Sequence, residues 1–167
     1  MMIRDENPRD YEAIKALVAA AFVDHPHSNQ GEARLVGALR DAGALTLSLV
    51  AEEAGQVVGH IAFSPVSIDG VEPGWYGLGP VAVRRDRQGQ GIGRQLIETG
   101  LARLAALGAA GCVLVGEPDF YGRFGFRADP RLTYAGVPPE YFMVRALSAP
   151  AVTPAGEVKF HPAFDDA

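Results

Sequence analysis

Gly77-Leu-Gly-Pro-Val-Ala-Val-Arg-Arg-Asp-Arg-Gln-Gly-Gln-Gly-Ile-Gly93 is the stretch that decides the fold, and a helical pattern follows it. Leu78 to Val83 is rich in aliphatic residues and indicates a strand. Gln88 to Gly93 is a loop with glycine at alternate positions, and Arg94 to Leu107 has apolar residues at helical spacing. A strand, a glycine-rich loop and a helix in this order aim backbone N–H groups and a helix N-terminus at one point. That arrangement is typical of a phosphate site.

The loop matches one of three phosphate-binding patterns in full. A Walker A loop requires Gly-Lys-Ser/Thr, but Arg94 follows the last glycine. A dinucleotide fingerprint has a third glycine where Arg94 stands, although Glu117 could still act as its ribose-binding acid, so this alternative stays open. Gln88, Gly91 and Gly93 match Gln/Arg-x-x-Gly-x-Gly/Ala, which resembles the coenzyme A pyrophosphate loop of the GNAT superfamily of N-acyltransferases. A tight glycine turn without a ligand is the structural alternative.

Two further features favour a ligand at this loop. Pro80 cannot donate to a β-ladder, so it indicates a break in pairing that would leave backbone groups of Val81 and Val83 without strand partners. An amide chain such as pantetheine can pair with such an edge like an extra strand. Arginines at positions 84, 85, 87 and 94 surround the loop of a protein whose net charge is −5. They suit a pyrophosphate and a 3′-phosphate, and a solvated basic patch is the alternative for some of them.

The composition disfavours several classes of protein. The acidic balance, with a pI of about 5.3, disfavours nucleic-acid partners. Cys112 is the only cysteine and lies in an apolar run, so we expect it to be buried, with no intrachain disulfide. His25 and His27 flank a proline without further ligand types, so we expect a loop and no metal. We find no signal peptide and no run long enough to span a bilayer, and therefore predict one cytoplasmic domain over residues 1–167.

Hydrophobic periodicity predicts an α+β domain. Helices are expected over 11–22, 32–39, 94–107 and 118–124, and strands over 2–4, 45–51, 57–66, 78–83, 112–115, 141–147 and 157–160. The apolar run at Cys112 to Val115 suits a buried strand parallel to Leu78–Val83, joined to it by the long helix in a right-handed crossover. We expect a mixed, mostly antiparallel sheet with helices on both faces, closed by two antiparallel strands near the C-terminus.

The order of elements and several motifs are similar to the GNAT superfamily, and within it to a bacterial group of predicted acetyltransferases. The shared motifs are Glu32…Leu35-Val36…Leu39-Arg40, Ala51-Glu52…Gly55…Val58-Gly59-His60, Leu78-Gly79-Pro80, Phe120-Tyr121-Gly122-Arg123-Phe124-Gly125-Phe126 and Gly156-x-Val158-x-Phe160…Ala163-Phe164. The resemblance covers most of the chain. It implies a single GNAT-fold domain whose central parallel strand pair splays apart at the cofactor.

The resemblance also implies acetyl-CoA as cosubstrate. Contacts with it are expected at Val81, Ala82, Val83, Gln88, Gly89, Gln90, Gly91, Ile92, Gly93 and Arg94. Direct acyl transfer requires a neutral amine, a stabilised carbonyl oxygen and a proton for the leaving thiolate. The resemblance places Tyr121 near the thioester sulfur, and the backbone N–H of Val81 is the expected oxyanion donor. A tyrosine with a pKa of about 10 stays protonated at neutral pH and can protonate a thiolate. A core aromatic role is the alternative for Tyr121.

The general base is not identified by the sequence, because residues 77–79 lack the glutamate that many relatives carry on the central strand. Glu32, His60 and Glu117 are candidates on the substrate side by position alone, together with Asp119. A water-mediated route needs no dedicated base. We predict an N-acetyltransferase acting on a primary amine, with no nucleic-acid or membrane partner and a homodimer as its assembly. A CoA-binding or regulatory module without turnover is the alternative.

Overall fold

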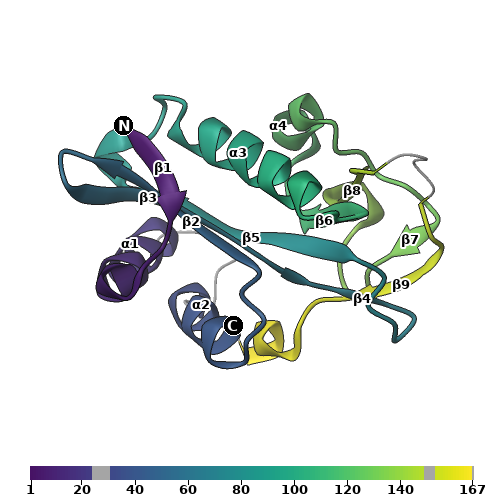
Figure 1. Cartoon of the computed structure of the whole chain (residues 1–167). Helices are drawn as coiled ribbons and strands as arrows, with labels where there is room; N and C mark the ends of the chain where they lie inside the picture. Colours follow the sequence, from purple (N-terminus) through teal and green to yellow (C-terminus); the bar gives the residue numbers. More distant parts are fainter. Residues whose placement is uncertain (24–30, 149–152, 167) are drawn as a thin grey trace.

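A six-stranded mixed sheet forms the centre of the computed structural model, which describes residues 1–23, 31–148 and 153–166 (Figure 1). The strand order is β1-β2-β3-β5-β6-β8. These strands are β1 (Met2–Asp5), β2 (Leu47–Glu53), β3 (Gln56–Pro65), β5 (Trp75–Val83), β6 (Gly111–Val115) and β8 (Phe142–Ala146). β5 and β6 run parallel, and the other four neighbouring pairs are antiparallel. The predicted α+β architecture is therefore confirmed.

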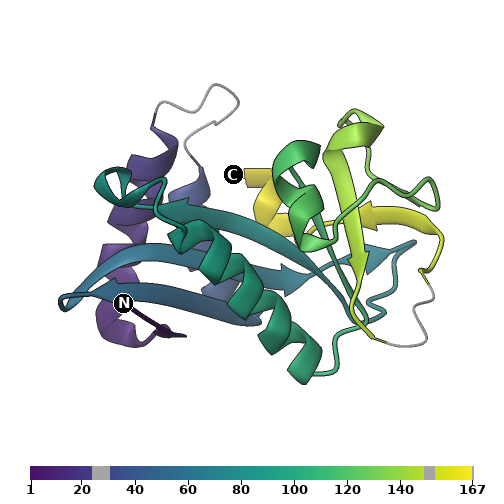
Figure 2. The same ribbon diagram turned by 90° about the horizontal axis from the view of Figure 1, so that it is seen from above.

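Helices cover both faces of this sheet (Figures 1 and 2). The α-helices are α1 (Tyr11–Phe22), α2 (Glu32–Asp41), α3 (Ile92–Ala106) and α4 (Pro118–Tyr121). Short 3₁₀ turns are η1 (Pro8–Asp10), η2 (Arg85–Arg87), η3 (Gly122–Phe124), η4 (Pro139–Tyr141) and η5 (Pro162–Asp166). Within the described ranges, no helix is long and apolar enough to cross a membrane.

Alternate side chains along each strand pack against the helices on opposite faces of the sheet. On one face, the apolar stripe of α3 at Leu96, Ile97 and Leu104 packs over Leu49 and Phe63 of the sheet. On the other face, the apolar residues of α1 pack over Val50 and Ala82. Because successive strand side chains point to opposite faces, neighbours such as Leu49 and Val50 enter different cores. The apolar residues whose spacing predicted these helices are thus the residues that pack against the sheet.

The C-terminal segment departs from the sequence prediction. Its two expected strands exist as β8 and β9 (Gly156–Lys159), but they do not close one sheet together. β9 instead forms a second, three-stranded sheet with β4 (Ser67–Ile68) and β7 (Leu132–Thr133), antiparallel to β4 and parallel to β7. Strands of two residues carry no readable period, so the sequence could not reveal this sheet.

The apolar tail after β9 is used within the chain. Ala163 and Phe164 pack against the buried Leu35 and Leu39 of α2. Phe160 lies edge-on to Tyr134 at 5.0 Å between ring centroids. These side chains therefore have partners within the chain, and the homodimer stays a prediction.

A matched pair of glycine substitutions tests the packing of α3. A Cβ at Gly100 would collide with the fully buried ring of Phe63, whereas a Cβ at Gly37 in α2 meets no atom within 4 Å. We expect Gly100→Ala to destabilise the protein by about 1–3 kcal/mol through overpacking. Gly37→Ala should stabilise it by about 0.5–1 kcal/mol, because alanine favours a helix. Urea denaturation measures both changes, and shifts of the same sign would contradict this account of the core.

Candidate active site

The parallel pair β5 and β6 separates shortly after it forms. Pairing joins Trp75–Gly77 to Gly111–Val113, whereas β5 continues to Val83 and β6 to Val115. α3 lies across this region and α4 follows the carboxyl end of β6 (Figure 2). The predicted splay of the central strands is therefore present, and it opens one edge of β5.

A bulge in β5 accompanies the separation. Across from β3, Ile61 pairs with Val81 but Phe63 pairs with Leu78, so β5 contains one extra residue at Gly79-Pro80. Gly79 has a φ of +152°, which favours glycine, and its bond to Pro80 is cis. The proline at this place could not have donated to a ladder in any case.

The bulge determines which way the next amides point. The N–H of Arg84 donates to the carbonyl of Val58 at 2.8 Å. Since hydrogen-bonded pairs alternate along an antiparallel ladder, the backbone groups of Val81 and Val83 face away from β3. They face the edge that β6 has left. Ala82 turns its backbone to β3 and its side chain to α1, so its groups do not reach this edge.

The glycine loop lies directly after that edge. Gly89 and Gly91 have φ values of +77° and +86°, and Gly91 is the N-cap of α3. Gln88, Gly89 and Gln90 are exposed, while Ile92 is buried and fixes the first turn of the helix in the core. The loop and the N-terminus of α3 are therefore exposed to solvent beside β5, where an anion can reach them. The Gln88 side chain also donates to the carbonyl of Val83 at 3.1 Å.

Three of the loop arginines differ in whether they form an ion pair. Arg84 pairs with Asp86 at 2.6 Å, and Arg87 pairs with Glu53 at 2.7 Å. Both guanidinium groups therefore have a carboxylate partner, and the Arg87–Glu53 pair ties the loop to the β2–β3 hairpin. Arg94 lies exposed in the first turn of α3, and the described residues give it no ion pair. Arg94 is thus available to an anion at the helix N-terminus.

Tyr121 lies at the other side of the opening, where β6 ends. A Cβ at Gly116 would collide with the Tyr121 ring, so the ring rests directly on the backbone at that glycine. The ring stands edge-on to Phe120 and Phe126, with centroids 4.9 and 6.2 Å away. Burial raises the pKa of the Tyr121 hydroxyl, which keeps it protonated at neutral pH. The sequence analysis did not predict that Gly116 supports the Tyr121 ring, although this glycine clearly precedes the predicted helix over 118–124.

Comparisons with known proteins agree with this geometry. Residues 45–128 match the family described as Acetyltransferase (GNAT) domain. The chain belongs to the GNAT acetyltransferase family. It is 40% identical to the uncharacterized N-acetyltransferase YhbS of Escherichia coli K12 over 171 residues, covering 99% of both proteins.

Two solved GNAT structures are similar over nearly the whole chain. A GNAT family acetyltransferase from Brucella melitensis in complex with acetyl-CoA shares 52% identity, with a TM-score of 0.88 over 98% of this chain and 97% of that one. YhbS from Escherichia coli in complex with CoA shares 39% identity, with a TM-score of 0.90 over 98% and 91%. The predicted resemblance to the GNAT superfamily is confirmed.

The remaining candidate residues lie apart in this GNAT fold. Glu117 is exposed directly before α4, and its carbonyl accepts the N–H groups of Phe120 and Tyr121. Glu32 is the partly buried first residue of α2. Cys112 is buried as expected, and burial raises the pKa of its thiol, so it is no nucleophile. The predicted loop at His25 and His27 lies outside the described residues.

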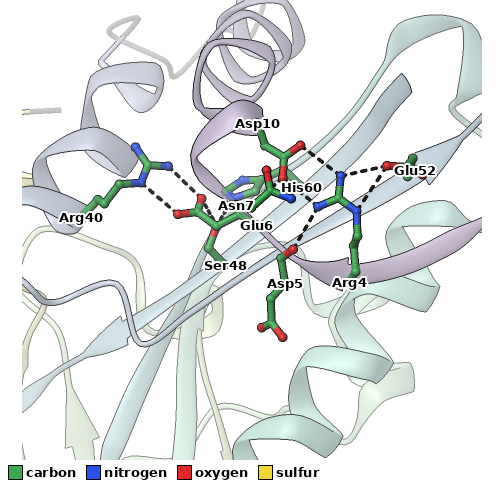
Figure 3. Close-up of polar contacts among 9 residues, drawn as sticks. All are labelled: Arg4, Asp5, Glu6, Asn7, Asp10, Arg40, Ser48, Glu52 and His60. Carbon is green, nitrogen blue, oxygen red and sulfur yellow. Dashed lines mark hydrogen bonds and ion pairs between the residues drawn. The ribbon is translucent and has the colours of Figure 1, made fainter. Parts of the chain in front are cut away.

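His60 belongs to a buried polar chain that the sequence did not predict (Figure 3). Its Nε2 lies 2.7 Å from the Oγ of Ser48, and that hydroxyl lies 2.6 Å from Glu6. Arg40 of α2 holds the Glu6 carboxylate with two hydrogen bonds of 2.8 and 2.9 Å. A separate ion pair nearby joins Arg4 to Asp10 at 2.7 Å. The His60 side chain has no exposed surface for a substrate to touch.

The burial of His60 predicts how stability depends on pH. Burial lowers the pKa of His60 from 6.5 to about 4, although the negative charge of Glu6 acts to raise it. The unfolded chain therefore binds a proton at a higher pH than the folded one. Stability is full above the unfolded value and falls by up to about 3 kcal/mol as the pH drops from about 6.5 to 4. We expect His60→Gln to flatten this fall, measured as unfolding free energies by urea titration at each pH.

The range above about pH 7.5 is the internal control for this experiment, because His60 is neutral there in both states. The difference between variant and wild type should be constant across that range. An equally steep acid loss in the variant would show that other groups cause it.

Proposed function

We propose that this protein transfers the acetyl group of acetyl-CoA to a primary amine by direct attack. The observation that carries the proposal is the continuous line from the open edge of β5 at Val81 and Val83 to the glycine loop at Gly91. An amide chain that extends the sheet there would deliver a following pyrophosphate to the N-terminus of α3. Similar proteins in complex with acetyl-CoA and CoA support the same cosubstrate.

Two steps of the transfer have a group of this chain assigned to them. The N–H of Val81, turned to the open edge, suits the thioester oxygen as it gains negative charge. The neutral amine nitrogen forms a bond to the acyl carbon, the carbon–sulfur bond breaks, and the nitrogen releases one proton to water. Tyr121 gives its proton to the departing sulfur and regains one from solvent. The acceptor amine, the homodimer and a cytoplasmic location remain predictions from the sequence.

Acetyl-CoA binding is tested with two glycines at opposite ends of α3. Gly91 and Gly108 have nearly equal φ values of +86° and +87°, and a Cβ at either meets no atom within 4 Å. Valine strains the backbone equally at both positions, because a β-branched residue disfavours a positive φ. We expect acetyl-CoA to raise the melting temperature of wild type and Gly108→Val by mass action, and to leave that of Gly91→Val unchanged.

Thermal shift with acetyl-CoA, and with NAD as the competing ligand, measures this difference. Equal stabilisation of both variants by acetyl-CoA would remove the loop from the cofactor site. A shift with NAD alone would favour the dinucleotide-binding alternative.

Tyr121→Phe tests the proton donor. The substitution keeps the ring on Gly116 and removes only the hydroxyl, so turnover should fall by about 10²–10⁴-fold while acetyl-CoA affinity changes little. Tyr134→Phe is the matched control, because burial also raises the pKa of Tyr134, which instead stacks on Phe142. CoA release during an amine screen measures turnover of all three proteins.

The screen also separates the enzyme from its alternative. Undiminished turnover in Tyr121→Phe would return the ring to the aromatic core. Acetyl-CoA binding without turnover of any amine by wild type would favour a CoA-binding or regulatory module.

A further inference from the structure

Arg145 of β8 lies beneath α3, yet the steps above make no use of it. It pairs across the sheet with Cys112 of β6, and it lies on the same face as Met143 and Leu147 at alternate positions of the chain. The Arg145 side chain is partly buried, and the described residues give it no carboxylate partner. A partly buried charge depends on hydrogen bonds where water is missing, so its contacts indicate what it does.

The guanidinium of Arg145 holds the end of the turn that follows Tyr121. Its Nη1 donates a hydrogen bond of 2.9 Å to the carbonyl of Phe124, the last residue of η3. The last carbonyl groups of a helix have no partner within the helix, so this donor satisfies one of them. The Arg145 side chain also lies against Gly125, because a Cβ added there would come within 3.3 Å of its Nε. In the described part of the chain, no other side-chain hydrogen bond reaches residues 118–126.

A surface cavity of about 490 Å³ lies between this turn and α3. Leu101 and Ala105 of α3 line it, together with Phe124 and Arg145. Apolar packing between α3 and the end of η3 is therefore incomplete, although the rings of Phe124 and Phe126 enter the core below. The hydrogen bond from Arg145 supports the turn at the place where packing with the helix is missing.

The position of Tyr121 depends on the same turn. η3 follows Tyr121 directly, so a group that fixes the end of η3 also restrains Tyr121, and the Tyr121 and Phe124 ring centroids are 6.4 Å apart. Burial is what raises the pKa of the Tyr121 hydroxyl, and within the described residues no hydrogen bond directs that hydroxyl. The place of the ring therefore decides which atoms its proton can reach.

We propose that Arg145 is a positioning residue for the proton donor, and that its hydrogen bond to the Phe124 carbonyl keeps the Tyr121 hydroxyl within reach of the departing sulfur. The inference rests on the proposed function, in which Tyr121 gives its proton to that sulfur. Arg145 moves no proton itself, because a guanidinium stays protonated at any working pH. A displacement of a reacting group by about 1 Å can cost on the order of 10²-fold in rate, so one hydrogen bond at this place affects turnover.

Arg145 variants test the proposal through turnover. Arg145→Met keeps an unbranched side chain against Gly125 and removes the donor to Phe124. With any amine that wild type acetylates, kcat should fall by about 10–100-fold, because the hydroxyl is no longer held at the sulfur. The KM for the amine and the acetyl-CoA thermal shift should change little, since the glycine loop is untouched. Arg145→Lys keeps a cationic donor and should restore most of the wild-type kcat.

A double-mutant cycle with Tyr121→Phe separates positioning from a purely structural role. If Arg145 acts through the Tyr121 hydroxyl, Arg145→Met should lower kcat by less than about twofold in a chain that already lacks this hydroxyl. A structural role predicts the same fall in both backgrounds, because the two substitutions would then act independently. Equal falls in the two backgrounds would therefore overturn the proposal.

Arg127→Met is the matched control for the loss of a positive charge. Its backbone pairs with Val144 of β8, but its side chain is exposed and forms no hydrogen bond within the described residues. The control should leave kcat unchanged in both backgrounds. A control that slows as much as Arg145→Met would assign the effect to lost charge and overturn the proposal. Arg145→Gln, with a shorter side chain, repeats the cycle if urea denaturation shows that Arg145→Met is poorly folded.

Failure of the proposed function gives a different result. A wild type that binds acetyl-CoA but acetylates no amine overturns both ideas together. A wild type that turns over, with Tyr121→Phe slowed and Arg145→Met as fast as wild type, overturns the role of Arg145 alone.

Discussion

The early end of pairing between β5 and β6 is the constraint on which the rest of the structure depends. Three residues of each strand pair, and the bulge at Gly79-Pro80 then turns the amides of Val81 and Val83 toward the vacated edge. Backbone groups without partners are costly unless water or a ligand satisfies them. The open edge is therefore stable as a solvated or ligand-paired surface. The helices and loops around it act to keep it open.

α3 fixes the position of that edge relative to the loop. Its buried stripe crosses β2, β3 and β5, and the close approach at Gly100 allows the Phe63 ring to lie directly against the helix. The helix N-terminus is thereby held beside Val83, since a Cβ added at Gly93 would lie 3.7 Å from that side chain. The Arg87–Glu53 ion pair and the hydrogen bond from Arg84 to Gln56 attach the loop to the β2–β3 hairpin. Arg94 is an exposed positive charge in the first turn of α3.

Features coded by adjacent residues could be predicted from the sequence. Each of three features lies within a short segment of sequence: the glycine loop, the break at Pro80 and the apolar stripes of the helices. All three were found where expected. The second sheet could not be predicted, because Ser67–Ile68 and Leu132–Thr133 are too short for a period. The buried chain of Glu6, Ser48 and His60 was also hidden. Ser48 is 42 residues from Glu6, each residue is ordinary in its own segment, and only the β-register brings them together.

Tyr121 and the buried His60 lie on opposite faces of the sheet. Tyr121 packs with the core under α3, whereas His60 lies with Val50 and Ala82 under α1. Burial raises the pKa of Tyr121 and so makes it a weaker acid, but a thiolate leaving into the same apolar surroundings becomes a stronger base. Burial therefore acts on both pKa values in the same direction, and the two effects oppose each other in the proton transfer.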